Sequence, residues 1–369
     1  MKSKKNIKNQ SDKEVRKKYS FCDFCSSRLK LKKNNKKSKE KCFICKNIFE
    51  QTDYTITKIL SALTSYEFSN FELGTTLKPS LIDRDDHIRS KFQVKGGDSI
   101  KTKINNVMSK KIARKTNTEI KHIDSDLTIK VNFKDETYEI LSKPIFIYGR
   151  YIKKSRIITQ KQKNCSNCFG KGCHACDFHG VKDFDSVEGQ ITQFLIKKFD
   201  CKQVRTNWVG GEEKSTRVLG NGRPFFAKII NPKKRKRILR TKNNLEGVQL
   251  QELRKINSQP KGQIFFKSRI EAIIRTDDNI KEKILKQLQI MQMPLQIHIN
   301  GKKTVEKKIY KMNFRKISPR LLKINMYVDG GISIKSLIHD SNVVPNLAYL
   351  LKTNCECVQF DFKKIDVVS

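Results

Sequence analysis

Eight of the eleven cysteines fall in C-x2-C pairs, and this spacing constrains the fold more than any other feature of the chain. The first set is Cys22, Cys25, Cys42 and Cys45, with a basic segment between its two pairs. Two such knuckles hold four thiolates tetrahedrally around Zn²⁺, and a site without an open position is structural. The metal would supply about 10–16 kcal/mol of folding free energy to a short ribbon that has little core of its own. Four free thiols are the alternative.

The second set of cysteines is more tightly spaced, and glycines lie between and after its pairs. These glycines permit the turns that aim backbone N–H groups at sulfur. We expect one structural Zn²⁺ held by all four thiols, with a site that holds no metal as the alternative. The three remaining cysteines have no partner spacing and are expected in the interior. The second set is Cys165, Cys168, Cys173 and Cys176, and the unpaired residues are Cys201, Cys355 and Cys357.

The charge of the chain predicts a nucleic-acid partner. The sequence has 78 Lys+Arg against 37 Asp+Glu, a formal net charge of +41, whereas ordinary solubility needs a magnitude of roughly 2–8. A protein with such an excess binds a polyanion by releasing its counterions. The two alternatives to a nucleic-acid partner are a lysine-rich genome and an anionic membrane.

The N-terminal segment and the hydropathy indicate a reducing compartment, and we expect the cytoplasm. No apolar run approaches the ~18 residues of a transmembrane helix, and residues 1–18 lack the apolar segment of a secretory signal. In a reducing compartment, closely paired cysteines serve metals rather than disulfides. No membrane and no obligatory protein partner are expected.

Hydrophobic patterning divides the chain into three parts: a basic arm and four-cysteine zinc ribbon over 1–50, a mixed α/β part over 51–145, and a longer mixed part over 146–369. Helical spacing predicts helices near 52–68, 186–199 and 333–340. Alternating or short apolar runs bounded by turn residues predict strands. These strands are expected over 126–152, 263–275, 294–301, 307–317, 321–331 and 357–367.

The segment from Trp208 to Phe225, WVGGEEKSTRVLGNGRPF, combines four glycines with two adjacent carboxylates, Glu212 and Glu213. Glycine permits close backbone approach. Acidic side chains in so basic a chain would be repelled by RNA unless they serve a purpose, which favours a functional loop. A hairpin linker with solvated acids is the alternative.

The order of four segments carries a resemblance: PIFIYGRY, the second cysteine set, GGEEKSTRVLGNGRPFFAKIINPKKRKR and YVDGGISIKSLIHD. It is similar to the Pus-ten family of tRNA pseudouridine synthases, which act on the T-loop. The likeness covers roughly residues 140–369, and LGNGRPF is its most diagnostic block. It implies an α+β fold with a zinc ribbon, a THUMP-like RNA-binding domain and a two-lobed mixed-sheet pseudouridine synthase domain with a cleft between its lobes.

The resemblance also implies the chemistry, which needs no cofactor. An aspartate of the family attacks a uridine flipped out of the RNA, the glycosidic bond breaks, and the base re-attaches through carbon at positions 54 and 55 of tRNA. Alignment on LGNGRPF puts Glu213 at the position of this aspartate, and Ser215 where many members have a second one. Displacing a reacting atom by ~1 Å can cost about 100-fold in rate. Three alternatives stay open: Glu213 is the nucleophile in a shifted loop, the protein binds tRNA without catalysis, or Glu212 or another residue has taken over.

Further roles follow from the resemblance, one residue at a time. Lys335 would pair with the active-site carboxylate, Leu337 would pack under the uracil, and Tyr310 would stack on the target base. Lys335 and Tyr310 each have a simpler alternative, as a surface and a core residue respectively. Arg223 would brace the loop or contact phosphate.

Basic clusters are the expected contacts to the tRNA backbone, because phosphate contacts set register without reading sequence. One cluster surrounds Arg150 and also includes Lys153, Lys154 and Arg156; the other is the run 233–240. The run KKRKR also resembles a nuclear import signal. A ribosomal or tRNA-thiolation accessory protein is a more distant alternative to the synthase. The expected RNA-binding residues, besides Leu337, are Arg150, Arg217, Arg223, Lys233, Lys234 and Arg235.

Overall fold

The computed structural model describes residues 18–30, 41–94, 96–301 and 304–368. The chain forms two compact units. One contains residues Met1–Lys143 together with Lys233–Lys236, and the other contains Pro144–Pro232 together with Arg237–Ser369. A short segment of the second half of the sequence therefore belongs to the first unit. The expected basic arm over 1–17 and most of the loop between the first cysteine pairs lie outside the described residues.

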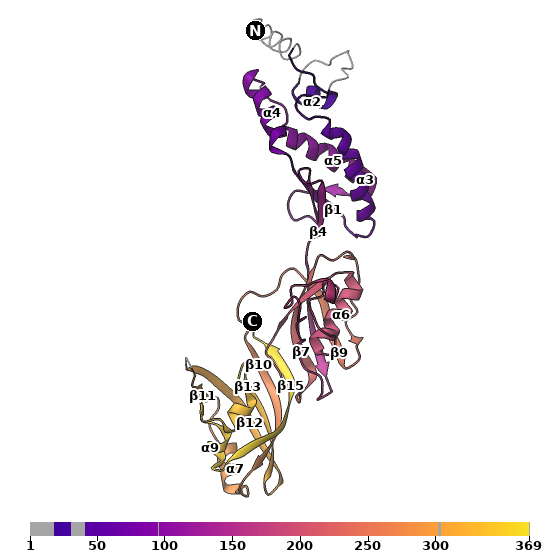
Figure 1. Cartoon of the computed structure of the whole chain (residues 1–369). Helices are drawn as coiled ribbons and strands as arrows, with labels where there is room; N and C mark the ends of the chain where they lie inside the picture. Colours follow the sequence, from indigo (N-terminus) through magenta and orange to yellow (C-terminus); the bar gives the residue numbers. More distant parts are fainter. Residues whose placement is uncertain (1–17, 31–40, 95, 302–303, 369) are drawn as a thin grey trace. The chain divides into compact units, whose positions relative to one another are not determined.

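The N-terminal unit is a four-stranded sheet with helices packed against it (Figure 1). The strand order is β2-β1-β3-β4, with β1 parallel to β2 and β3, and β3 antiparallel to β4. The strands are β1 (Asn70–Thr76), β2 (Glu119–Ile120), β3 (Leu127–Asn132) and β4 (Thr137–Ser142), and the helices are α2 (Asp23–Arg28), α3 (Ile48–Leu63), α4 (Pro79–Lys91) and α5 (Ile100–Thr116).

The core of this unit is formed by residues at helical spacing. Helix α3 confirms the helix expected from that spacing, whereas α4 and α5 were not expected. In α5 the residues Ile100, Ile104, Met108 and Ile112 recur every fourth position and are all buried. Ser99 begins the helix by accepting a hydrogen bond from the backbone N–H of Thr102.

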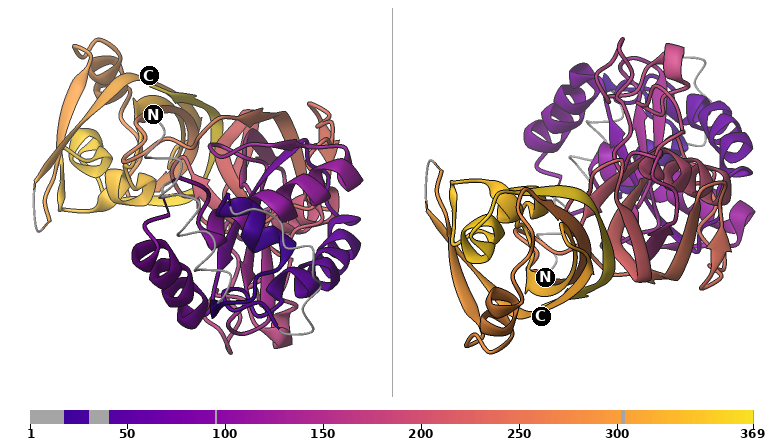
Figure 2. Two further views of the ribbon diagram at one scale, coloured as in Figure 1. Left: turned by 90° about the horizontal axis from the view of Figure 1, so that it is seen from above. Right: turned by 90° about the horizontal axis from the view of Figure 1, so that it is seen from below.

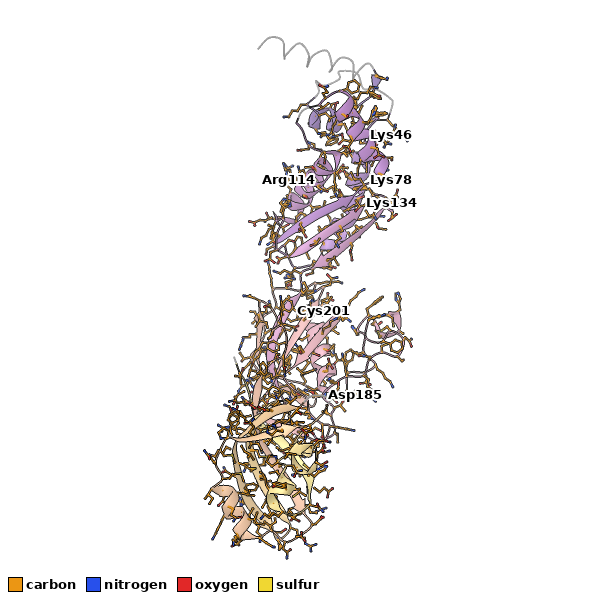
Figure 3. The ribbon with its side chains drawn as sticks, turned by 90° about the vertical axis from the view of Figure 1, so that its left-hand side faces the viewer. Lys46, Lys78, Arg114, Lys134, Asp185 and Cys201 are labelled. Atoms are coloured by element: carbon orange, nitrogen blue, oxygen red, sulfur yellow. The ribbon has the colours of Figure 1, made fainter. Side chains whose placement is uncertain are left out.

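Basic side chains lie on the outside of the N-terminal unit. Lys46, Lys78, Arg114 and Lys134 are exposed, and they come from different parts of the unit (Figure 3). Part of the positive charge of the sequence is therefore displayed on the surface of this unit.

The first cysteine segment packs into this same core instead of forming a separate domain. Cys25, Cys42 and Cys45 are buried among the apolar residues of the helices. Arg28 lies 2.5 Å from Asp85 of α4, and both side chains are almost wholly buried. The carboxylate of Asp85 also accepts a hydrogen bond from the first residue of α5. These contacts tie the cysteine segment to both α4 and α5.

The C-terminal unit is built on one large mixed sheet, with β6 pairing with β7 beside the main path β14-β11-β12-β13-β10-β15-β7-β5-β9-β8. Strands β15 and β7 are parallel where they meet, at Asp361↔Arg217 and Phe362↔Val218, and this pairing joins two lobes. Figure 2 shows the lobe of β10 to β15, coloured orange to yellow, strongly curved. The strands are β5 (Ile145–Lys153), β6 (Gln203–Trp208), β7 (Arg217–Ile230), β8 (Asn243–Asn244), β9 (Val248–Ile256), β10 (Phe266–Thr276), β11 (Leu295–Ile299), β12 (Val305–Ser318), β13 (Leu321–Asp329), β14 (Val343–Val344) and β15 (Cys355–Val367).

The helices of the C-terminal unit cover the two lobes separately. Helix α6 (Val187–Phe199) belongs to the first lobe, where its buried stripe of Val187, Ile191, Leu195 and Phe199 packs on the sheet. Helix α8 (Ile334–His339) packs on β15 in the second lobe. Both were predicted from their spacing, whereas α7 (Glu282–Gln289) and α9 (Leu347–Leu351) were not. Within the described ranges, none of the helices could span a bilayer.

Candidate active site

The glycine-rich loop brings Glu213 beside Lys335. Residues 209–216 connect β6 to β7 without forming a helix or strand, whereas Arg217–Phe225, the second half of the segment expected as a loop, belong to β7. The Oε2 atom of Glu213 lies 2.7 Å from Nζ of Lys335, which is in the first turn of α8. The Glu213 carboxylate raises the pKa of Lys335 through this hydrogen bond and its negative charge. Both side chains are about half exposed, at 42% and 48%, so the pair is within reach of a ligand.

The neighbouring Glu212 has a different environment, because its carboxylate is buried between two cations. Its Oε1 lies 3.2 Å from Nζ of Lys153 and its Oε2 lies 3.2 Å from Nε of Arg223. None of the three side chains has exposed surface. Glu212 is thus unavailable to a substrate in this structure, which argues against the alternative in which it replaces Glu213.

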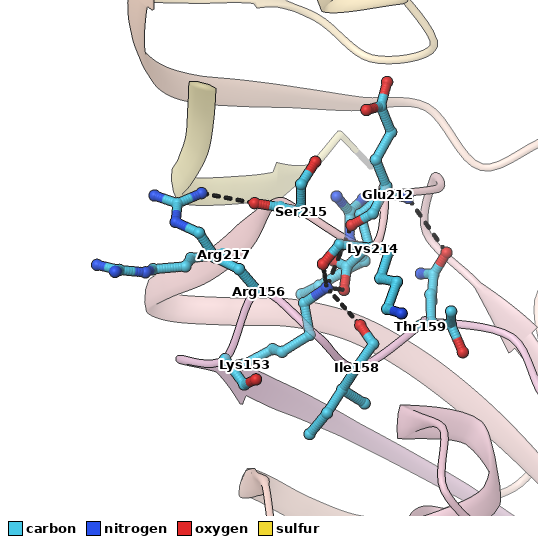
Figure 4. Close-up of polar contacts among 12 residues, drawn as sticks. Lys153, Arg156, Ile158, Thr159, Glu212, Lys214, Ser215 and Arg217 are labelled. Carbon is cyan, nitrogen blue, oxygen red and sulfur yellow. Dashed lines mark hydrogen bonds and ion pairs between the residues drawn. The ribbon is translucent and has the colours of Figure 1, made fainter. Parts of the chain in front are cut away.

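Lys153 is the residue that holds the backbone of the loop in place (Figure 4). Its amino group donates hydrogen bonds to the carbonyl oxygens of Glu213 and Lys214, at 3.2 and 3.3 Å. It also donates to the carbonyl of Ile158 at 3.0 Å. Burial lowers the pKa of Lys153, and the charge of Glu212 opposes that shift. A single buried cation therefore fixes the peptide on the C-terminal side of Glu213.

A second basic residue holds the far end of the same loop. Arg156 donates to the carbonyl of Ser215 at 2.6 Å and to the carboxylate of Asp361 on β15 at 2.8 Å. The other oxygen of Asp361 accepts the backbone N–H of Arg217 at 3.0 Å. Lys153 and Arg156 were expected to contact RNA, but the structure uses both to position the loop.

Arg223 and Arg150 are both buried, so the prediction that they contact the phosphate backbone of RNA is wrong for this structure. Arg223 has no exposed surface, donates to the carbonyl of Val209 at 2.8 Å, and stacks 4.3 Å above the ring of Phe362. It braces the loop, the other role considered for it. Arg150 is 9% exposed and donates to the backbone carbonyls of Gly222 and Ile365.

A cavity of about 290 Å³ lies between this loop and the segment that leads into α8. Ser268 and Ile270 of β10 and Phe362 of β15 form part of its lining. The rest of the lining comes from Gly211 of the loop, Arg223 of β7, Phe266 of β10, Val328 and Asp329 at the end of β13, and Gly330, Gly331, Ile332 and Ser333 in the turn before α8. Sequence reasoning did not identify Ser268 or Ile270, since each reads as an ordinary strand residue.

Leu337 does not line this cavity. It is on α8, two residues after Lys335, but its side chain has no exposed surface and packs in the apolar core. The predicted contact between Leu337 and the base is therefore not available in this structure.

Tyr310 is not among the residues that line this cavity, but it contacts one that is. Its stacking on the target base stays a prediction. The ring of Tyr310 lies against Lys267 and the ring of Tyr327, and its hydroxyl donates to Asp329 at 3.0 Å.

The basic run after β7 contributes to the N-terminal unit. Arg235 donates to the hydroxyl of Ser142 at 2.9 Å and pairs with Asp126 at 3.5 Å. It is held by protein groups, contrary to the expectation that this run is free for RNA. Lys233 and Lys234 are half-buried, and Arg217 is exposed. For these three residues the RNA contact stays a prediction.

Both cysteine sets have a geometry that fits a tetrahedral metal. In each, the four sulfur atoms lie within 4.8 Å of one another. The second set has Sγ–Sγ distances of 3.8 Å for Cys168–Cys176 and 4.0 Å for Cys165–Cys173. Zinc–sulfur bonds of about 2.3 Å at tetrahedral angles give edges of about 3.8 Å.

Backbone N–H groups also point at the sulfurs of the second set. Gly172 donates to Cys168 and Gly180 donates to Cys176, both at 3.2 Å. Both glycines have positive φ, and a Cβ at Gly172 would lie 2.6 Å from the carbonyl of Phe178. The glycines are therefore required where the sequence predicted tight turns around thiolates.

Comparison with known proteins gives two family models and several relatives. The model "Pus10, C-terminal" matches residues 146–366, and "Pus10 THUMP domain, archaeal" matches residues 56–132. A protein named tRNA pseudouridine synthase Pus10 from Nitrosopumilus maritimus (strain SCM1) is 40% identical over 96% of this chain and 97% of its own length. Proteins of the same name from Cenarchaeum symbiosum (strain A) and Archaeoglobus fulgidus are 31% and 26% identical, covering 88% and 87% of this chain and 81% and 94% of their own lengths.

Proposed function

Because the chain belongs to the Pus10 family of tRNA pseudouridine synthases, we propose that it isomerises T-loop uridines of tRNA, at positions 54 and 55, with Glu213 as the nucleophile. The enzyme class is an isomerase acting on tRNA. The observation that carries the site assignment is the position of the Glu213 carboxylate, which is half exposed and 2.7 Å from Lys335, on a loop that also lines a cavity.

The chemistry asks for an ionised carboxylate at a fixed position. A carboxylate is charged at neutral pH and forms a reversible covalent adduct. The bond between N1 of uracil and the ribose breaks, a bond from C5 forms, and the proton leaving C5 is replaced by one on N1. Lys335 orients the carboxylate, and Lys153 fixes the backbone from which the longer glutamate side chain extends.

The target base must leave the RNA stack before it reaches Glu213. Arg217, Lys233 and Lys234 are the cations proposed to hold the RNA backbone during this step. Their contacts would be to phosphate, so affinity should fall steeply as salt rises. The two four-cysteine groups are proposed to hold one structural Zn²⁺ each, with no role in the reaction.

Carbodiimide mapping of pseudouridine after incubation with an unmodified tRNA transcript tests the proposal. Wild type should form pseudouridine in the T-loop, and Glu213→Ala should form none while binding tRNA equally well. Glu213→Asp should retain product if the loop tolerates the shorter side chain.

The rival function is a tRNA-binding protein that has lost catalysis. It is favoured by one residue alone, the glutamate at position 213. Absence of product from wild type together with clear product from Glu213→Asp would establish it, because the scaffold would then be competent and only the side-chain length at fault.

A further inference from the structure

We propose that the cavity beside the Glu213 loop recognises uracil through the hydroxyl of Ser268 and the Nη2 group of Arg223. The inference rests on the proposed function, since it assumes that a uridine enters this site. It assigns to Ser268 and Arg223 a role in specificity that is separate from the nucleophilic role of Glu213.

The first observation is that both groups are buried and unpaired. Ser268 Oγ and Arg223 Nη2 have no hydrogen-bond partner among the described residues. Ser268 is 2% exposed and Arg223 has no exposed surface. Leaving a buried polar group unsatisfied costs about 1–3 kcal/mol, so two such groups at one cavity call for a ligand.

The second observation is that the two residues line the same cavity. Its volume of about 290 Å³ is at the lower end of ligand pockets, which are roughly 300–1,000 Å³, and suits a single pyrimidine ring. Ile270, Phe362 and Phe266 provide apolar lining for the faces of the ring. Apolar walls with a few placed polar groups are typical of small-ligand sites.

The third observation is the rigidity of Arg223. Two of its three side-chain nitrogens are used, one by Glu212 and one by the carbonyl of Val209. Its guanidinium group is stacked on Phe362. The remaining nitrogen is therefore held in one orientation, and a preorganised donor loses little entropy when it binds.

These donors match uracil better than cytosine. Uracil presents two carbonyl oxygens on either side of N3–H, and each can accept one hydrogen bond. Cytosine has an amino group in place of the carbonyl at C4, so only one of the two carbonyl acceptors remains for the two donors. Arg223 also contacts Glu212, the residue before the nucleophile, so base recognition and the nucleophile loop share one side chain.

Ser268→Ala is the informative variant, with Thr192→Val as its matched control. The hydroxyl of Thr192 on α6 is also buried and unpaired among the described residues, but Thr192 does not line the cavity. Removing an unpaired buried hydroxyl should not lower the thermal midpoint of either variant. Ser268→Ala should lower single-turnover kcat/KM on tRNA about tenfold, the effect of one lost hydrogen bond, while Thr192→Val should leave it unchanged.

Thio-substituted substrates identify the contacted atoms. Transcripts with 2-thiouridine or 4-thiouridine at the target positions replace one carbonyl oxygen by a poor acceptor. Each should slow wild type, and with one of them the additional penalty of Ser268→Ala should vanish, because the two changes remove the same hydrogen bond. Penalties that simply multiply with both substrates would overturn the assignment of Ser268.

A binding measurement separates this inference from the proposed function. Wild type should bind a T-arm hairpin with uridines at the target positions more tightly than one with abasic sites there, and Ser268→Ala should reduce that difference. Product from wild type with equal rates for Ser268→Ala would refute base recognition and leave the function intact. Equal affinity of wild type for the two hairpins would refute it even if no product forms.

Discussion

Lys153→Met should destabilise the C-terminal unit more than any surface substitution of a lysine. The change removes the amino group that lies 3.2 Å from Glu212 and that donates to three backbone carbonyls, while methionine fills much of the same space. Glu212 keeps Arg223 as a partner, so the cost is that of one lost ion pair and of three backbone carbonyls left without their charged donor. At roughly 1–3 kcal/mol for each unsatisfied group, the total is about 4 kcal/mol. With a urea dependence of about 2 kcal/mol per M, the unfolding midpoint should fall by roughly 2 M.

The single tryptophan reports on this unit specifically. Trp208 lies at the end of β6, and its ring is 5.5 Å from the ring of Tyr151. The hydroxyl of Tyr151 accepts a hydrogen bond from Gln160, which lies next to the buried ion pairs of Glu212. Urea titrations followed by its fluorescence should show the shift for Lys153→Met and none for the exposed neighbour variant Lys154→Met. Adding Glu212→Gln to Lys153→Met should deepen the loss, because it leaves the buried charge of Arg223 without its partner carboxylate. A loss below about 1 kcal/mol for Lys153→Met would refute the reasoning.

Three further outcomes are expected. Metal analysis should give two zinc ions per chain. Cys25→Ser should lower the thermal stability of its unit more than Cys168→Ser lowers that of the other unit, because Cys25 lies in the core. Equal losses of stability in the two variants would contradict this difference. The pKa of Lys335 is raised above its ordinary value of 10.5. The ammonium group of Lys335 therefore stays charged below pH 10.5, and its ion pair with Glu213 is lost only as the pH rises through the raised pKa. Wild type and Lys335→Arg should therefore have equal rates up to about pH 10, and a decline of wild type alone below that pH would count against the pair. Tyr310→Phe should leave the rate within about threefold, because the ring that would stack on a base is kept, and should cost roughly 1 kcal/mol of stability through the lost hydrogen bond to Asp329; a larger loss of activity would show that the hydroxyl itself takes part in the reaction.

Sequence reasoning placed those parts of the site whose residues belong to contiguous motifs. The glycine-rich loop gave Glu213 its position, and the short helix after Gly331 brought Lys335 to it. This pairing was predicted from the family resemblance and not from the residue types. A lysine and a glutamate more than one hundred residues apart have no local sequence pattern that indicates their contact. Helix α5 had a local signal in its apolar residues at every fourth position, and it was overlooked.

The burial of several basic residues could not be predicted from their sequence context. In a chain with 78 lysines and arginines, a basic residue beside a motif reads as a phosphate contact. Arg150 and Lys153 are instead on β5, whose residues are almost all buried because the strand lies between β7 and β9. The apolar run IFIYG before them is the usual sign of such a strand. The face to which Tyr310 points could not be predicted for a different reason: a register shift between Ile309 and Lys311 interrupts the regular alternation of faces at its position.

The four residues Lys233–Lys236 have a consequence for anyone who cuts this protein into pieces. Sequence comparison assigns them to the C-terminal domain, which spans 146–366, yet their contacts are with Glu67, Asp126 and Ser142 of the other unit. The chain thus crosses between the units three times. A fragment that starts at residue 144 would leave the guanidinium of Arg235 without its acceptors, and a fragment that ends at 143 would lose the segment that pairs with Glu67. Neither piece made by a single cut keeps all of its native contacts, so the two halves should be expressed and engineered together.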